Sequence, residues 1–80
     1  MRILFRESDS RLVHTVFVVD FSAEFQTDGT FAVLIQDCEG DYWVCKSMPF
    51  DDFDEYAYHL AVNGFIDLRK YLFDLDVIRP

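Results

Sequence analysis

The expected fold depends most on residues 11–25, which read RLVHTVFVVDFSAEF. Alternate positions in this stretch are apolar, a period typical of a β-strand with one buried face. The stretch is longer than a usual strand, so we expect a bend or bulge at residues 20–22, or two strands run together. The expected buried face consists of Val13, Thr15, Phe17, Val19, Phe21, Ala23 and Phe25.

Short turns separate this stretch from its neighbours. Residues 8–10, 28–29 and 39–40 combine Ser, Asp, Glu and Gly in the manner of hairpin turns. Two-residue turns at 28–29 and 39–40 would place both Ala23 and Cys45 opposite Leu34. The sequence therefore predicts four antiparallel strands at residues 2–7, 11–25, 30–37 and 42–48.

Two helices are expected after the strands, at residues 52–63 and 65–75. Asp51 is a suitable N-cap for the first helix, and Gly64 can adopt the left-handed conformation that ends it. The predicted fold is therefore a single α+β domain spanning residues 1–80, a β-meander of about four strands followed by two helices packed on one face. Apolar stripes at helical spacing support both helices, Phe53, Tyr56, Ala57, Leu60 and Ala61 in the first and Phe65, Leu68, Leu72 and Leu75 in the second.

The opposite face of the predicted sheet is also apolar. A sheet with water behind it should be polar on that side, so a wide apolar face there suggests an interface. We expect this face to contact a partner or a second copy of the chain, unless the second helix covers it. Its residues are Phe31, Val33, Ile35, Tyr42, Val44 and Met48.

Composition limits what the domain can do. Hydrophobic residues make up 51% of the 80 positions and aromatic residues 18%, which is too apolar for a disordered chain. The formal net charge is −8. An anionic membrane or the phosphate backbone of a nucleic acid is therefore not an expected direct partner.

Motifs for chemistry are missing from the sequence. Its three glycines cannot form a phosphate-binding loop, and no metalloprotease or paired-cysteine motif occurs. Asp37, Glu39 and Asp41 alternate like calcium ligands, but the loop glycine and the distal glutamate are not in place. Cys38 and Cys45 would be too far apart along the ladder for a disulfide and have no zinc-ligand spacing. We expect no enzyme, no cofactor, no metal and no disulfide.

The compartment is suggested by the first residues. Ile3, Leu4 and Phe5 form an apolar run too short for a secretory signal, and no run is long enough for a membrane span. We expect a cytoplasmic protein, in the host cytoplasm if the chain is viral, where thiols stay reduced.

Negative charge is concentrated in the middle of the chain. Residues 20–68 contain eleven acids and only one base, Lys46, for a net charge of −10. The predicted chain path brings the turn at residues 28–29 and the start of the first helix to the same end of the sheet. The acidic end so formed consists of Asp28, Asp51, Asp52, Asp54 and Glu55.

Two functions fit these features. The first is a small acidic protein-binding module that docks on a basic surface of a partner, such as a nucleic-acid-binding protein that it inhibits. In size, acidity and lack of catalytic motifs the chain resembles small phage inhibitors of bacterial defence systems, such as anti-CRISPR proteins and DNA mimics. The alternative is a structural or regulatory homodimer joined through the apolar sheet face, in which charge serves only solubility.

Overall fold

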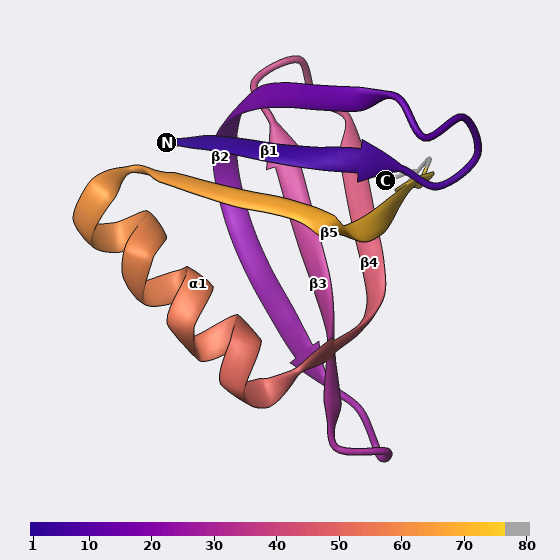
Figure 1. Cartoon of the computed structure of the whole chain (residues 1–80), viewed down its shortest axis with the longest axis vertical. Coiled ribbons are helices and arrows are strands. Elements are labelled where there is room, and N and C mark those ends of the chain that lie inside the picture. Colours follow the sequence, from indigo (N-terminus) through magenta and orange to yellow (C-terminus); the bar gives the residue numbers. More distant parts are fainter. Residues whose placement is uncertain (77–80) are drawn as a thin grey trace.

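A computed structural model describes residues 1–76 of the chain, and Figure 1 shows their arrangement. The four strands and the first helix expected from the sequence are present. The structure differs after residue 64, where a fifth strand replaces the second helix. In chain order the elements are β1 (Arg2–Glu7), β2 (Val13–Phe25), β3 (Thr30–Asp37), β4 (Tyr42–Pro49), α1 (Phe50–Asn63) and β5 (Phe65–Asp76).

The five strands form a closed barrel in the order β1-β2-β3-β4-β5. Neighbouring strands of a meander alternate in direction, so a closed ring with an odd number of strands must contain one parallel pair. That pair is β1 and β5, which closes the barrel. The predicted α+β meander with two helices on one face is therefore wrong, because the last segment completes the sheet instead of covering it.

The strand β5 forms where a second helix was expected because its buried residues follow the period of a strand. Ile66, Leu68 and Phe73 are buried at 3%, 0% and 0% exposure. Phe65 and Leu72 of the expected helical stripe are exposed. A register shift between Phe5 and Arg6 of β1 accommodates the residues that separate the two buried parts of β5. Pairing with β1 thus overrides the helical spacing of the stripe.

The long strand β2 changes its buried face at a register shift between Val18 and Asp20. Before this shift the even-numbered Val18 is buried, and after it the odd-numbered Phe21 and Ala23 pack against the core. The expected bend is present, slightly earlier than residues 20–22. It lets the first part of β2 pair with β1 and the second part with β3. The single buried face predicted for residues 13–25 is therefore wrong, and Val13, Phe17, Val19 and Phe25 are exposed.

The hairpin turns are each one residue longer than expected. The N–H of Gln26 donates to the carbonyl of Thr30 at 2.8 Å, and Gly29 takes the left-handed conformation at φ 86°. The second hairpin closes at Asp37 and Asp41 in the same way. A shift of one residue moves every side chain to the other face of a sheet. The β3–β4 register therefore pairs Val33 with Cys45 and Leu34 with Val44.

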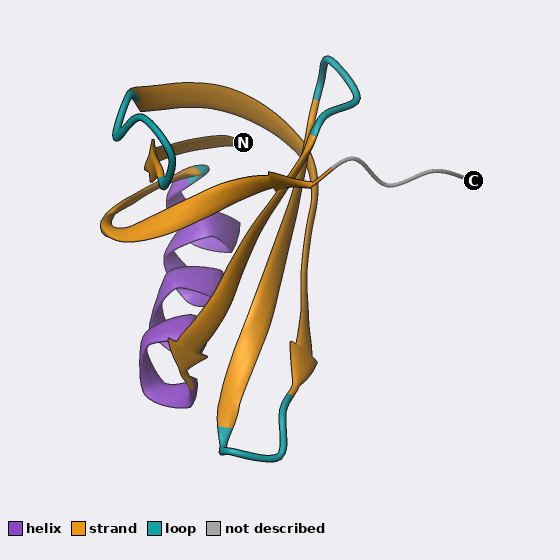
Figure 2. Cartoon of the chain, turned by 90° about the vertical axis from the view of Figure 1, so that its right-hand side faces the viewer, coloured by secondary structure: helices purple, strands orange, loops and turns teal. Residues whose placement is uncertain are grey.

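The helix α1 lies beside the barrel, where β4 and β5 separate (Figures 1 and 2). Its Leu60 is buried, and Phe53 and Tyr56 pack against the core. Gly64 ends the helix at φ 71°, as expected, and its N–H donates to Leu60 at 2.9 Å. The N-cap position is Pro49, which makes no side-chain hydrogen bond to the helix. Asp51, predicted as the N-cap, lies instead in the first turn. Within residues 1–76, no helix has the length and apolar character needed to cross a bilayer.

Candidate functional site

The acidic end predicted from the sequence forms at one end of the molecule. Thr30 pairs with Pro49 at the end of the β3–β4 ladder. This pairing places the β2–β3 turn, with Asp28, at the same end as the first turn of α1. Figure 1 shows both at the lower end of the molecule. The two successive hairpins thus bring Asp28 to the same end of the molecule as the acids at residues 51–55.

The carboxylate of Asp28 is held in place by its own turn. It accepts hydrogen bonds from the hydroxyl of Thr30 at 2.6 Å and from the Thr30 N–H at 2.9 Å. The hydroxyl bond, and then the backbone bond, lower the pKa of Asp28. The side chain is therefore a fixed negative charge at the tip of an exposed turn.

Asp52 differs from the other acids of this end because it faces the barrel. Its carboxylate lies 3.0 Å from Nζ of Lys70 and accepts a hydrogen bond from the hydroxyl of Tyr71. The Tyr71 bond, and then the Lys70 bond, lower the pKa of Asp52. These contacts tie α1 to β5, so Asp52 has a structural role and is largely neutralised.

The remaining acids of α1 point into solvent. Asp51, Asp54 and Glu55 are exposed, and Glu55 lies 3.7 Å from Nε2 of His59. No ion pair joins any of these three to a Lys or Arg among residues 1–76. The acidic end therefore presents Asp28, Asp51, Asp54 and Glu55 as outward carboxylates.

The apolar sheet face predicted from the sequence is not a single surface. Val33, Ile35 and Met48 have no exposed area and belong to the core, and Phe31 packs against Phe53 at a ring distance of 5.0 Å. Tyr42 and Val44 instead lie on the outside of β4, half-buried. The added residue in the Glu39-Gly40 turn is the cause, since it places Val44 on the face opposite Ile35.

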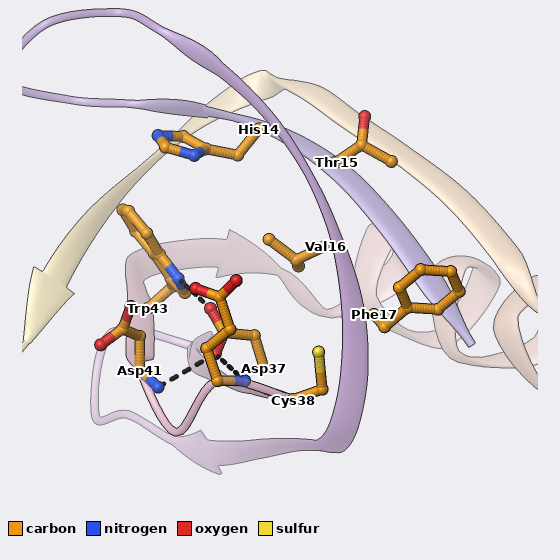
Figure 3. A pocket seen from close by; sticks show the side chains of 9 residues that line it. His14, Thr15, Val16, Phe17, Asp37, Cys38, Asp41 and Trp43 are labelled. Atoms are coloured by element: carbon orange, nitrogen blue, oxygen red, sulfur yellow. Dashed lines mark hydrogen bonds between the residues drawn. The ribbon is translucent and has the colours of Figure 1, made fainter.

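A cavity with both polar and apolar lining residues lies at the other end of the barrel, under the β3–β4 turn (Figure 3). It has a volume of about 290 Å³, and His14, Asp37, Cys38 and Trp43 are among its lining residues. The Asp37 carboxylate is buried and accepts three hydrogen bonds, from Nε1 of Trp43 at 3.1 Å and from the N–H groups of Glu39 and Asp41, both at 3.0 Å. These three hydrogen bonds hold the turn and the indole of Trp43 in place, so the Asp37 carboxylate has a structural role.

His14 belongs to the same cavity. Its ring contacts the rings of Phe5, at a centroid distance of 5.5 Å, and Trp43, at 4.7 Å. The Nε2 atom is shielded from solvent without a hydrogen bond and lies 3.6 Å from a Glu7 carboxylate oxygen. The part of the chain that the structure describes holds no group of three or more His, Cys, Asp or Glu side chains arranged as metal ligands.

The two thiols lie in different environments. Cys45 is buried in the core, where burial raises the pKa of its thiol, and Cys38 is exposed at the rim of the cavity. Both are free thiols in the structure. A buried thiol with a raised pKa is a poor nucleophile.

Sequence reasoning assigned no site to four further acids that lie on the outside of the barrel, Asp20 and Glu24 of β2 and Asp74 and Asp76 of β5. The spacing of two or four residues within each pair could have shown that its members share one face. The bend in β2 and the replacement of the second helix by β5 hid that relation.

Comparison with protein-family models, with curated proteins and with solved structures finds no match for the chain. The function proposed below therefore depends on the geometry and charge of the residues themselves.

Proposed function

We propose that this chain is a small protein-binding domain without enzymatic activity, whose acidic end docks on a basic surface of another protein. The observation that supports the proposal is the set of outward carboxylates at this end, Asp28, Asp51, Asp54 and Glu55. An acidic surface of this kind speeds the encounter with a basic partner and selects against acidic ones.

The rest of the molecule does little to offset this charge. All fifteen acids lie within residues 1–76. Among those residues, only Asp52 and Asp67 form ion pairs with Lys or Arg. Unpaired carboxylates on a domain of net charge −8 produce a field of one sign, and such a field favours association with a positive surface.

We further propose that the partner is a nucleic-acid-binding protein that the chain inhibits. A surface that binds phosphates is lined with Lys and Arg. The carboxylates of the acidic end would occupy that surface in place of phosphates. In this proposal the chain acts in the cytoplasm, that of the host if the chain is viral, as small inhibitors of phage anti-defence type do.

The homodimer alternative loses the surface on which it depended. It required Val33, Ile35 and Met48 to be accessible on one sheet face, and these residues are in the core. The acidic docking proposal is therefore the one we take forward.

The test is the affinity of a partner, captured at low salt from a lysate of the cells that contain the chain and then purified. The Asp54→Lys/Glu55→Lys variant should bind it about tenfold more weakly at low salt, with the loss shrinking as salt rises. The matched control is Asp9→Lys/Glu39→Lys, which makes the same change in charge at exposed turns away from the acidic end. Equal losses in both variants, or no loss in either folded variant, would contradict the proposal.

A further inference from the structure

The outer face of the sheet between β2 and β5 has a regular pattern of side chains. In one row across the four strands, Ser22 pairs with Leu34, Leu34 with Val44, and Val44 with Asp74. The row two residues away along the strands has an acid at each end. It runs Asp20, Gln36, Tyr42, Asp76.

The two central strands of this face present mainly apolar side chains. Ala32 and Leu34 of β3 and Tyr42 and Val44 of β4 are all half-buried here. A depression of about 250 Å³ lies over this apolar strip, and Ser22, Ala32, Leu34 and Val44 are among its lining residues. The small side chains of Ser22 and Ala32 leave room that a larger side chain from outside could fill.

Carboxylates border the apolar strip on both sides. Asp20 and Glu24 stand on β2, and Asp74 and Asp76 stand on β5. Asp74 accepts a hydrogen bond from the hydroxyl of Ser8. None of the four forms an ion pair with a Lys or Arg among the residues described. The exposed Lys46 follows the strip along β4, whereas Arg69 and Lys70 of β5 are paired with Asp67 and Asp52.

The dimensions of this face match those of an α-helix. Adjacent strands are about 4.8 Å apart, so the two acidic borders, three strand spacings apart, are separated by roughly 14 Å. An α-helix with its side chains is about 10–12 Å wide. In the two rows through Leu34–Val44 and Gln36–Tyr42, β3 and β4 are each paired on both sides, so a partner lying over the strip would meet side chains and no free backbone groups.

We propose that this outer face binds a basic amphipathic helix of a partner protein. The apolar stripe of the helix would lie along Leu34 and Val44 and fill the depression. Lysine and arginine side chains on its two flanks would extend over the strip and reach the carboxylates on β2 and β5, because their long aliphatic stems can cover apolar surface. An acidic or evenly polar helix would satisfy only one part of this face.

This inference goes beyond the proposed function because it concerns a different surface and a different mode of binding. The acidic end is a polar surface at the start of α1, where charge alone would attract a partner. The outer face combines charge with apolar contact and a width that selects a helix. A partner can bind to either surface without binding to the other.

The test uses a synthetic peptide of about four helical turns with leucines along one stripe and lysines on both flanks. Its matched control has the same composition in a scrambled order without a stripe. Fluorescence anisotropy should show that the amphipathic peptide binds the whole chain at least about tenfold more tightly than the scrambled one. Amide shifts in NMR spectra should be concentrated at residues 32–36 and 42–46.

Two variants separate this face from the acidic end. Asp20→Lys/Glu24→Lys should weaken peptide binding about tenfold, whereas Asp54→Lys/Glu55→Lys, with the same change in charge, should weaken it less than about threefold. Leu34→Ser/Val44→Thr changes only outward side chains and should remove the preference for the amphipathic peptide. Circular dichroism would confirm that each variant is folded.

Three results would overturn the inference. The scrambled peptide could bind as tightly as the amphipathic one, or the two charge variants could lose the same affinity, which would indicate attraction by net charge alone. Peptide-induced shifts confined to the start of α1 would place the peptide at the acidic end. That last result would leave the proposed function standing while this inference failed.

Discussion

Asp37 shows at the scale of one residue how a charge can be buried in a small barrel. Its carboxylate accepts from the Trp43 indole and from two N–H groups of the turn that follows it. The indole of Trp43 in turn lies against Phe5 at a ring distance of 5.0 Å. One carboxylate therefore links the β3–β4 turn to the aromatic part of the core.

Replacing Asp37 with Ala should reduce the free energy of unfolding by about 1–3 kcal/mol, because the buried Trp43 N–H loses its acceptor. Urea unfolding followed by tryptophan fluorescence measures this loss. Asp41→Ala is the control, since the Asp41 side chain accepts none of these bonds and is exposed. A loss below about 0.5 kcal/mol for Asp37→Ala would mean that water replaces the carboxylate without cost.

Asp52 leads to a prediction about pH. Its folded-state pKa is depressed by Tyr71 and Lys70, so its contribution to stability is present above the ordinary Asp pKa, about 3.9, and is lost as pH falls through the depressed value. Asp52→Asn should therefore be less stable than the natural chain at pH 7, and this difference should shrink as pH falls below about 4. Thermal unfolding across that range is the measurement.

The control for this pH prediction is Asp54→Asn, a change at an exposed acid without contacts to Lys70 or Tyr71. It should unfold within about 0.5 kcal/mol of the natural chain at pH 7. If the difference in stability between Asp52→Asn and the natural chain stays constant down to pH 2, the Asp52 contacts act through packing and not through charge.

At the scale of an element, β5 is the segment whose conformation distinguishes the barrel from the expected two-helix fold. The helical stripe would bury Leu72, whereas the strand buries Phe73 at 0% exposure and leaves Leu72 at 37%. The two conformations therefore predict opposite sensitivities at adjacent positions.

Phe73→Ala should lower the free energy of unfolding by about 3–5 kcal/mol, and Leu72→Ala by less than about 1 kcal/mol. Because a loss of that size could unfold so small a domain, Phe73→Leu gives a milder test, with an expected loss of about 1 kcal/mol. Urea midpoints measure all three. A larger loss for Leu72→Ala than for Phe73→Leu would contradict the strand.

At the scale of the whole molecule, charge repulsion opposes folding. The radius of gyration is 11.7 Å, which is smaller than the Debye length of about 30 Å at 0.01 M salt and close to the length of about 10 Å at 0.1 M. At low salt each carboxylate therefore interacts with most of the others, and added salt screens this repulsion.

The melting temperature should accordingly rise by a few degrees between about 0.01 and 0.15 M sodium chloride. In the Asp54→Lys/Glu55→Lys variant, whose net charge is less negative, the rise should be smaller. Scanning calorimetry measures both. A melting temperature that falls with added salt would mean that attractive pairs such as Asp52–Lys70 outweigh the repulsion.

The sequence by itself determined the local features of this protein. The positions of the first four strands follow from alternation and from turn residues, and α1 from its apolar stripe and Gly64. The gathering of Asp28 with the acids of α1 could also be predicted, because it requires only that two hairpins follow one another. Each of these features depends on contacts between neighbours in the chain, which sequence patterns record.

Only the tertiary structure decided which faces are buried. One added residue in each hairpin turn exchanged the two faces of β3, so Val33 and Ile35 entered the core and Leu34 left it, while Val44 of β4 remained outside. The pairing of β5 with β1 closed the barrel, although the apolar spacing of residues 65–75 favours a helix. Apolar residues such as Leu68 are compatible with either a helix or a strand. The strand forms because these residues pair with β1, which lies more than sixty positions away along the chain.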